Sequence, residues 1–151
     1  MDAVLLEASL TGPEEVLAAV ETVALHSAVD EWYLLVHSWP WEKRAIGILH
    51  LPAGGGYVRR ASGGPAFPAG GDTVYAALVG PRRPGAPIPL RDVYEQLRRL
   101  VAPCSSAGPL RYECWGATVA AAAGKLAQRP VIELAGPRDA VLGVVRESVS
   151  T

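Results

Sequence analysis

The residues best suited to chemistry lie in the run Arg-Arg-Ala-Ser-Gly-Gly at positions 59–64. Gly63 and Gly64 have no Cβ atom, so a ligand can approach their main chain closely. Successive N–H groups in such a turn can form an anion-binding concavity. If Arg59 and Arg60 end a strand, they alternate sides, and one of them can face a pocket while the other faces outward. Arginine suits planar contacts with phosphate or carboxylate, and Ser62 adds a hydroxyl. The run therefore predicts a site for a phosphate-bearing ligand.

The same run also fits an ordinary surface hairpin with solvated arginines, because loops rich in Gly and Pro are common. It does not contain the G-x-x-x-x-G-K-S/T pattern of a P-loop. The residues alone leave both interpretations open.

Lysine is rare in this chain, which has twelve arginines but only Lys43 and Lys125. Much of this bias fits a codon or host preference. A compact ammonium and a planar guanidinium are nevertheless not interchangeable. A retained lysine is therefore a candidate functional group, and an ordinary surface lysine is the alternative.

Length and composition narrow the class of protein. The chain has 151 residues, of which 50% are hydrophobic and 19% charged, with a net charge of −1. This predicts one globular domain, 1–151, without the broad basic surface of a nucleic-acid or membrane binder. No run is long enough for a membrane span, and the acidic start MDAVLLEASL lacks a signal-peptide pattern. We expect a cytoplasmic protein in which Cys104 and Cys114 are reduced, half-buried thiols.

The elements that must position these residues follow from periodicity and turn signals. They predict an α+β fold, a mixed and mainly antiparallel β-sheet with helices packed on it. The expected helices are 13–28, 90–101 and a short final helix after the turn at 136–139. The expected strands are 3–10, two strands forming a hairpin within 32–50, a short strand at 57–60, then 73–79, 111–121 and 126–134, with a turn at Gly124 and a loop at 103–109.

The sequence VRRASGGPAF resembles the signature of the lipoate-protein ligase, octanoyltransferase and biotin-protein ligase family. Four further blocks match in the same order. They are VLAAVETVALHSA, LLVHSWPWEKRAIGIL, GGDTVYAALV and AAAAGKLAQRPVIEL, and the five blocks together cover most of residues 16–134. In the last block Lys125 falls on the family lysine that contacts the acyl-adenylate.

The resemblance implies a biotin/lipoate-protein ligase-like fold and chemistry on a lipoyl, octanoyl or biotinyl group. ATP with Mg²⁺ would activate lipoate or octanoate as an acyl-adenylate, and the acyl group would pass to a lysine of a lipoyl or biotinyl carrier domain. Lys125 would be catalytic. The residues that would bind the substrate or adenylate are Arg60, Ser62, Gly63, Gly64, Pro65 and Ala66.

Differences from the family pattern leave other functions open. Pro65 stands where the family has a third glycine, which removes an N–H donor, and the histidine after the alanine has no counterpart. The family's C-terminal accessory domain has no counterpart either, so a separate accessory chain is one expected partner. The alternative is a non-catalytic homologue that binds an acyl ligand or a partner. A minor third option is a cysteine nucleophile at Cys104 or Cys114.

Overall fold

The computed structural model describes residues 1–49, 56–83, 85 and 87–151. The helices are α1 (Pro13–His26), α2 (Leu90–Leu100) and α3 (Arg138–Ser148). The strands are β1 (Val4–Leu6), β2 (Tyr33–Ser38), β3 (Arg44–Ile46), β4 (Tyr57–Arg59), β5 (Thr73–Val79), β6 (Ser105–Gly108), β7 (Arg111–Cys114), β8 (Ala117–Leu126) and β9 (Arg129–Pro137).

Seven of these strands form one sheet in the order β1-β2-β5-β9-β8-β7-β6. Strands β1 and β2 run parallel, and every other neighbouring pair in this sheet is antiparallel. A separate two-stranded parallel sheet joins β3 to β4. The expected α+β fold, with a mixed and mainly antiparallel sheet, is confirmed.

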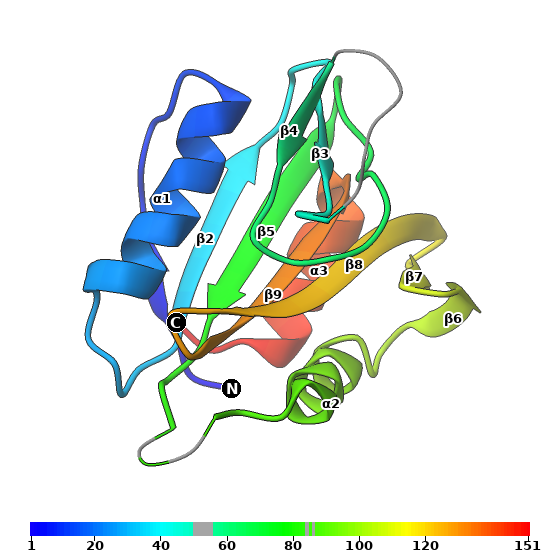
Figure 1. Ribbon diagram of the computed structural model, residues 1–151. Coiled ribbons are helices and arrows are strands. Elements are labelled where there is room, and N and C mark those ends of the chain that lie inside the picture. The colour runs from blue at the N-terminus through cyan, green and yellow to red at the C-terminus, as the bar shows by residue number, and fades with distance from the viewer. Residues whose placement is uncertain (50–55, 84, 86) are drawn as a thin grey trace.

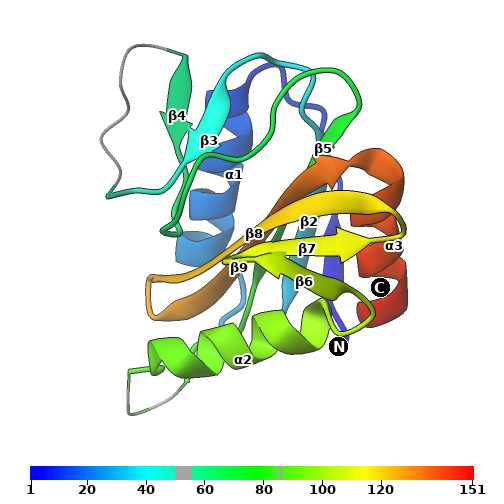
Figure 2. The ribbon, with the colours of Figure 1, turned by 90° about the vertical axis from the view of Figure 1, so that its right-hand side faces the viewer.

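The large sheet is buried on both faces because its central strands alternate between two apolar cores. In β5, Val74, Ala76 and Leu78 belong to one core, with apolar side chains of α2 and α3. Tyr75 and Ala77 belong to the other core, with side chains of α1, β3 and β4. Figures 1 and 2 show α1 and the β3–β4 pair on one face of the sheet and α3 on the opposite face.

The ends of α1 follow from its sequence. Pro13 occupies the first turn, where its missing N–H is no loss, and acidic residues follow at the positive end of the helix. At the other end, the buried Arg129 side chain donates to the Ala28 and Glu31 carbonyls and to the Ser27 hydroxyl. This arginine fixes the exit of the helix against the start of β9.

The hairpin expected within residues 32–50 does not form over the described part, and residue 50 lies outside the described residues. Both edges of β2 are occupied, by β1 and by β5. Trp39 is buried, its backbone N–H donates to the Thr73 carbonyl, and its indole donates to the Lys43 carbonyl. The chain therefore leaves the large sheet at Trp39, and β3 pairs with β4 instead of β2.

The turn expected at Gly124 is also wrong. Strand β8 continues through Gly124 to Leu126, and the chain reverses at Ala127 and Gln128, which have φ angles of 52° and 62°. Two residues with positive φ give a tight hairpin turn whose twist suits antiparallel strands. The expected loop at 103–109 contains β6, and the expected strand 111–121 is divided into β7 and β8 by a second tight turn at Trp115 and Gly116.

Within the described residues, no helix is both long and apolar enough to cross a membrane.

Candidate functional site

The glycine loop, residues 60–67, follows β4 and lies against the α1 face of the large sheet. Its main chain approaches two glycines so closely that a side chain on Gly47 would overlap the loop and one on Gly124 would be tightly crowded. A Cβ atom on Gly47 would lie 2.3 Å from the Gly64 carbonyl oxygen, and one on Gly124 would lie 3.0 Å from Ser62 Cα. Gly64 itself has a φ of 109°, a conformation that favours glycine. Glycines outside the signature therefore determine where the loop lies.

Backbone hydrogen bonds hold this loop to β3 and the residues after it. Gly47 N–H donates to the Gly64 carbonyl at 3.0 Å, and Ile48 N–H donates to the Ser62 carbonyl at 3.1 Å. These contacts fix the loop from the side, while the sheet supports it from beneath.

A buried polar cluster lies between the loop and the sheet. Glu133, in the middle of β9, is 0% exposed. One of its carboxylate oxygens, Oε1, accepts the Ser62 N–H at 3.0 Å and also the Ser62 hydroxyl, and the other accepts the Tyr75 hydroxyl. Burial raises the pKa of Tyr75 well above its usual value, and the nearby Glu133 carboxylate raises it further. Tyr75 is therefore a hydroxyl donor at neutral pH.

Arg60 supplies the cation of this cluster and is only 1% exposed. Its guanidinium donates to the Ala45 carbonyl at 2.8 Å, to the Gly63 carbonyl at 3.0 Å and to the Ser62 hydroxyl oxygen at 3.3 Å. It also stacks over the Phe67 ring, with Cζ 3.9 Å from the ring centroid. Burial lowers the pKa of Arg60, and the Glu133 charge opposes that shift. Arg60 and Ser62 therefore make their hydrogen bonds to other residues of the protein, on the buried side of the loop.

The other four predicted contact residues form the outer surface of the loop. Gly63 and Pro65 are exposed, and Gly64 and Ala66 are half-buried. Ile48, whose N–H donates to the Ser62 carbonyl of the loop, and the following residue Leu49 are exposed apolar residues, at 51% and 89%. A small-residue surface with an apolar border can accept an apolar chain that ends in a charged group.

Lys125, the predicted catalytic residue, lies next to Gly124 near the end of β8. Because side chains alternate along a strand, the strand places Lys125 on the opposite face from Gly124 and the glycine loop. Its ammonium donates to the Ile88 carbonyl at 2.8 Å, just before α2. The structure brings together the six loop residues, but it directs the Lys125 side chain toward α2.

The prediction that the two cysteines are reduced thiols is wrong. Cys104 and Cys114 form a disulfide at the base of the β6–β7 hairpin. The β6–β7 antiparallel register places these residues opposite each other, which the sequence spacing alone did not reveal. In this state neither sulfur is a free thiol, so the structure does not present the cysteine nucleophile of the third option.

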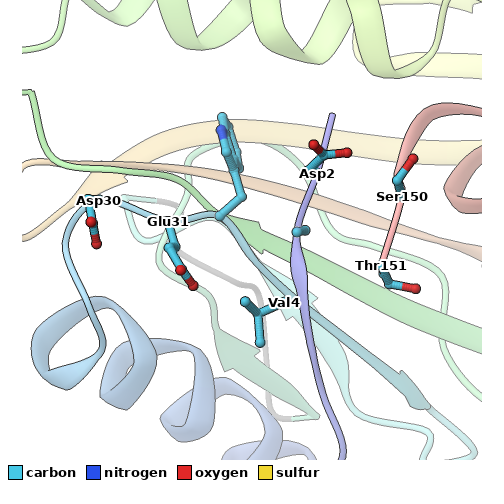
Figure 3. Close-up of a pocket in the computed structure, with 8 residues that line it drawn as sticks. Asp2, Val4, Asp30, Glu31, Ser150 and Thr151 are labelled. Carbon is cyan, nitrogen blue, oxygen red and sulfur yellow. The ribbon is translucent and has the colours of Figure 1, made fainter.

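Two cavities of the molecule differ in the charged residues that line them. A cavity of about 430 Å³ lies near the two termini, and Figure 3 shows residues that line it. Its lining includes the carboxylates of Asp2, Asp30 and Glu31, so it disfavours an anionic ligand. Another cavity, of about 350 Å³ beside α2, includes Arg82, Arg83 and Asp92 in its lining, and Asp92 pairs with Arg83. Neither cavity includes the glycine loop.

In residues 1–49, 56–83, 85 and 87–151, no group of three or more His, Cys, Asp or Glu side chains could hold a metal ion.

Sequence reasoning missed Glu133 and Tyr75. A charged residue inside the apolar run Val-Ile-Glu-Leu-Ala was the available signal for Glu133, because a carboxylate is rarely fully buried unless it is paired. Tyr75 gave no signal of its own, since a tyrosine in a strand is an ordinary core residue.

No protein-family model and no curated protein matches this sequence. Solved structures do match. Ta0514 of T. acidophilum, provisionally identified as a lipoate protein ligase and solved with bound lipoic acid, has a TM-score of 0.65 and 13% identity over 99% of this chain and 88% of that chain.

Two further solved structures agree in fold. A bipartite lipoate protein ligase of Thermoplasma acidophilum, described with its E2 lipoyl domain, gives a TM-score of 0.56 and 14% identity over 100% of this chain and 74% of that one. LipL1 of P. falciparum in complex with lipoate gives a TM-score of 0.54 and 11% identity, over 91% of this chain and 48% of that one. The chain therefore has the fold of the lipoate-protein ligases.

Proposed function

We propose that this chain is a lipoate-protein ligase-like acyltransferase. It binds a lipoyl or octanoyl group, or a biotinyl group, as an acyl-adenylate and passes the acyl group to a carrier-domain lysine. The observation that carries this proposal is the fold it shares, over 99% of its length, with a protein that holds lipoic acid. The Arg-Arg-Ala-Ser-Gly-Gly loop on the α1 face of the sheet gives that fold a ligand surface.

The acyl chain lies along the outer surface of the glycine loop. Gly63 allows close approach, since the space beside it is open, and the exposed Ile48 and Leu49 side chains form an apolar border. Transfer of apolar ligand surface from water to this border contributes roughly 25 cal/mol per Å². Binding of the acyl chain of the ligand therefore needs no charged contact.

The charged end of the ligand needs more than Arg60. The guanidinium lies behind the loop, and Glu133 balances its charge. Attraction for a carboxylate or phosphate therefore comes from the loop N–H groups and from Lys125. In this proposal the Lys125 ammonium leaves the Ile88 carbonyl and swings around the end of β8 toward the ligand. Its four-carbon stem is flexible enough for such a movement.

The chemistry has two steps. In the first, a carboxylate oxygen of lipoate attacks the α-phosphorus of ATP, and pyrophosphate leaves with the electron pair of the broken P–O bond. In the second, the neutral amine of the carrier lysine attacks the acyl carbon, AMP leaves, and the amide nitrogen loses a proton. Both steps build negative charge on oxygen, which the Lys125 ammonium stabilises.

Partners follow from the same chemistry. Mg²⁺ would arrive on the ATP phosphates, because this ion is commonly held by phosphates and water with few protein ligands. The acyl acceptor is a lipoyl or biotinyl carrier domain. An accessory chain is proposed because one structural neighbour is bipartite.

The test is a mass measurement on a lipoyl carrier domain. The chain is incubated with lipoate, ATP and Mg²⁺, with and without the accessory subunit of a bipartite ligase. A further reaction supplies preformed lipoyl-adenylate. We expect the carrier to gain the mass of one lipoyl group, at least from the adenylate. Binding of lipoyl-adenylate without transfer in any reaction would support the non-catalytic homologue. The absence of both binding and transfer would refute the proposal.

A further inference from the structure

Glu133 is a fully buried carboxylate in the centre of the large sheet, with no role in the proposed reaction. Its neighbours across the sheet are Ala77 on β5 and Ala122 on β8. Both are small, so the sheet leaves space at this point. Ser62 of the glycine loop contacts Glu133 there. Small residues on the two neighbouring strands therefore make room for one acidic side chain beneath the glycine loop.

The contacts of Glu133 converge on the loop. Its Oε1 atom accepts two hydrogen bonds from Ser62, one from the backbone N–H at 3.0 Å and one from the hydroxyl. Ser62 is in turn bonded to Arg60, whose guanidinium reaches the Gly63 carbonyl at 3.0 Å. One carboxylate therefore fixes the residue at which the loop begins to cross the sheet.

Stability alone gives no reason for this arrangement. Arg60 and Glu133 are opposite charges joined through the Ser62 hydroxyl, and buried charges of this kind are often no more stabilising than well-packed apolar residues of similar volume, whereas they can select one conformation. Hydrogen bonds with fixed partners restrict the loop to one path, which an apolar contact would not do. The arrangement suits a loop whose main chain must be ready for a ligand, since a preformed site avoids the entropy loss of ordering on binding.

We propose that Glu133 is the positioning residue of the glycine loop, holding it through Ser62 in the conformation that receives the acyl ligand. Glu133 does not touch the ligand. The ligand part of this inference rests on the proposed function, whereas the positioning part concerns the unliganded protein.

The positioning part is tested by amide hydrogen exchange of the unliganded protein, resolved by residue. The amide of residue 62 donates directly to Glu133, so its exchange rate reports that bond. We expect Glu133→Gln to speed exchange at residue 62 by about tenfold or more, since a neutral amide oxygen replaces the charged carboxylate as the acceptor of its N–H. Ser62→Ala keeps the N–H bond and should accelerate this amide less. Amides of α3 should not change in either variant.

The ligand part is tested by calorimetric titration with lipoate. Glu133→Gln and Ser62→Ala should each raise the Kd for lipoate by about tenfold. The double variant should be no weaker than Glu133→Gln alone, because both changes break one connection. In the transfer reaction the KM for lipoate should rise, and the KM for the carrier domain should not. Glu147→Gln, an exposed change on α3, is the matched control and should leave all values unaltered.

Several outcomes separate the possibilities. A folded Glu133→Gln protein with unchanged exchange at residue 62 would overturn the inference, as would independent, additive effects of the two changes on lipoate affinity. If the unsubstituted chain binds no acyl ligand, the proposed function fails while the exchange measurement still decides the positioning role. If Glu133→Gln does not fold, Tyr75→Phe replaces it, because this change removes a single bond to the same carboxylate.

Discussion

The substitution Gly63→Ala separates ligand contact from folding. A Cβ atom at this position would have no other atom within 4 Å, and the backbone φ does not lie in the left-handed region. Alanine therefore fits the folded chain. Because alanine also restricts the unfolded chain, we expect the free energy of unfolding to stay equal or rise by about 0.4–1 kcal/mol. Thermal unfolding measures this directly.

The same methyl group would stand on the surface along which the ligand is proposed to lie. Forcing an extra methyl into a close contact costs about 1–3 kcal/mol, which corresponds to a Kd for lipoate raised about 5- to 150-fold. Isothermal titration with lipoate is the assay. A Gly63→Ala protein that binds lipoate as tightly as the unsubstituted chain would refute the placement of the ligand on this loop.

Gly47→Ala is the informative contrast. Its Cβ atom would lie 2.3 Å from the Gly64 carbonyl oxygen and 2.6 Å from the Gly64 nitrogen, both main-chain atoms. The loop would have to move, so this variant should lose both stability and lipoate affinity. Gly12→Ala, where the nearest atom would be 3.7 Å away on Glu14, is a control outside the loop and should bind lipoate normally.

Three further predictions concern Lys125, Tyr75 and the disulfide. Lys125→Met should reduce transfer from lipoyl-adenylate about 10²- to 10³-fold. The free energy of unfolding should change by less than about 1 kcal/mol, because the Lys125 side chain is exposed. Transfer at an unaltered rate would remove this residue from the mechanism. The raised pKa of Tyr75 keeps the folded state protonated when the unfolded tyrosine ionises, so stability should fall as the pH rises above about 10. Tyr75→Phe should flatten that fall in alkaline unfolding curves, and an unchanged slope would contradict the assignment. Reduction of the Cys104–Cys114 disulfide, which joins residues 10 apart, should lower the free energy of unfolding by about 3 kcal/mol; denaturant curves with and without reductant should coincide if the bond does not form in solution.

Local patterns predicted the elements whose own residues carry a clear signal, either a short apolar run or an amphipathic period. The strand at 73–79 was predicted with its observed bounds, and the helix at 90–101 differs from α2 by one residue. The strand is a short run of mostly apolar residues that is buried at every position, and the helix has a regular amphipathic period. The glycine loop was also recognisable, since its composition suits close main-chain approach whether or not a ligand is bound.

Long-range pairing was less predictable. The β3–β4 pair depends on Trp39 leaving the sheet, and Trp39 is held by Thr73, 34 positions away in the sequence. Gly124 was interpreted as a turn, although its missing side chain makes room for Ser62 rather than for a reversal. The orientation of Lys125 depends on the register of β8, which a shift of one residue would invert. Periodicity within a segment contains none of this information.

The most direct test of the central claim is an amide chemical-shift titration with a stable analogue of lipoyl-adenylate. We expect saturable shifts concentrated on residues 60–67 and on the end of β8 at Gly124 and Lys125. Shifts centred instead on the acidic cavity near the termini, or no saturable shifts at all, would contradict the claim.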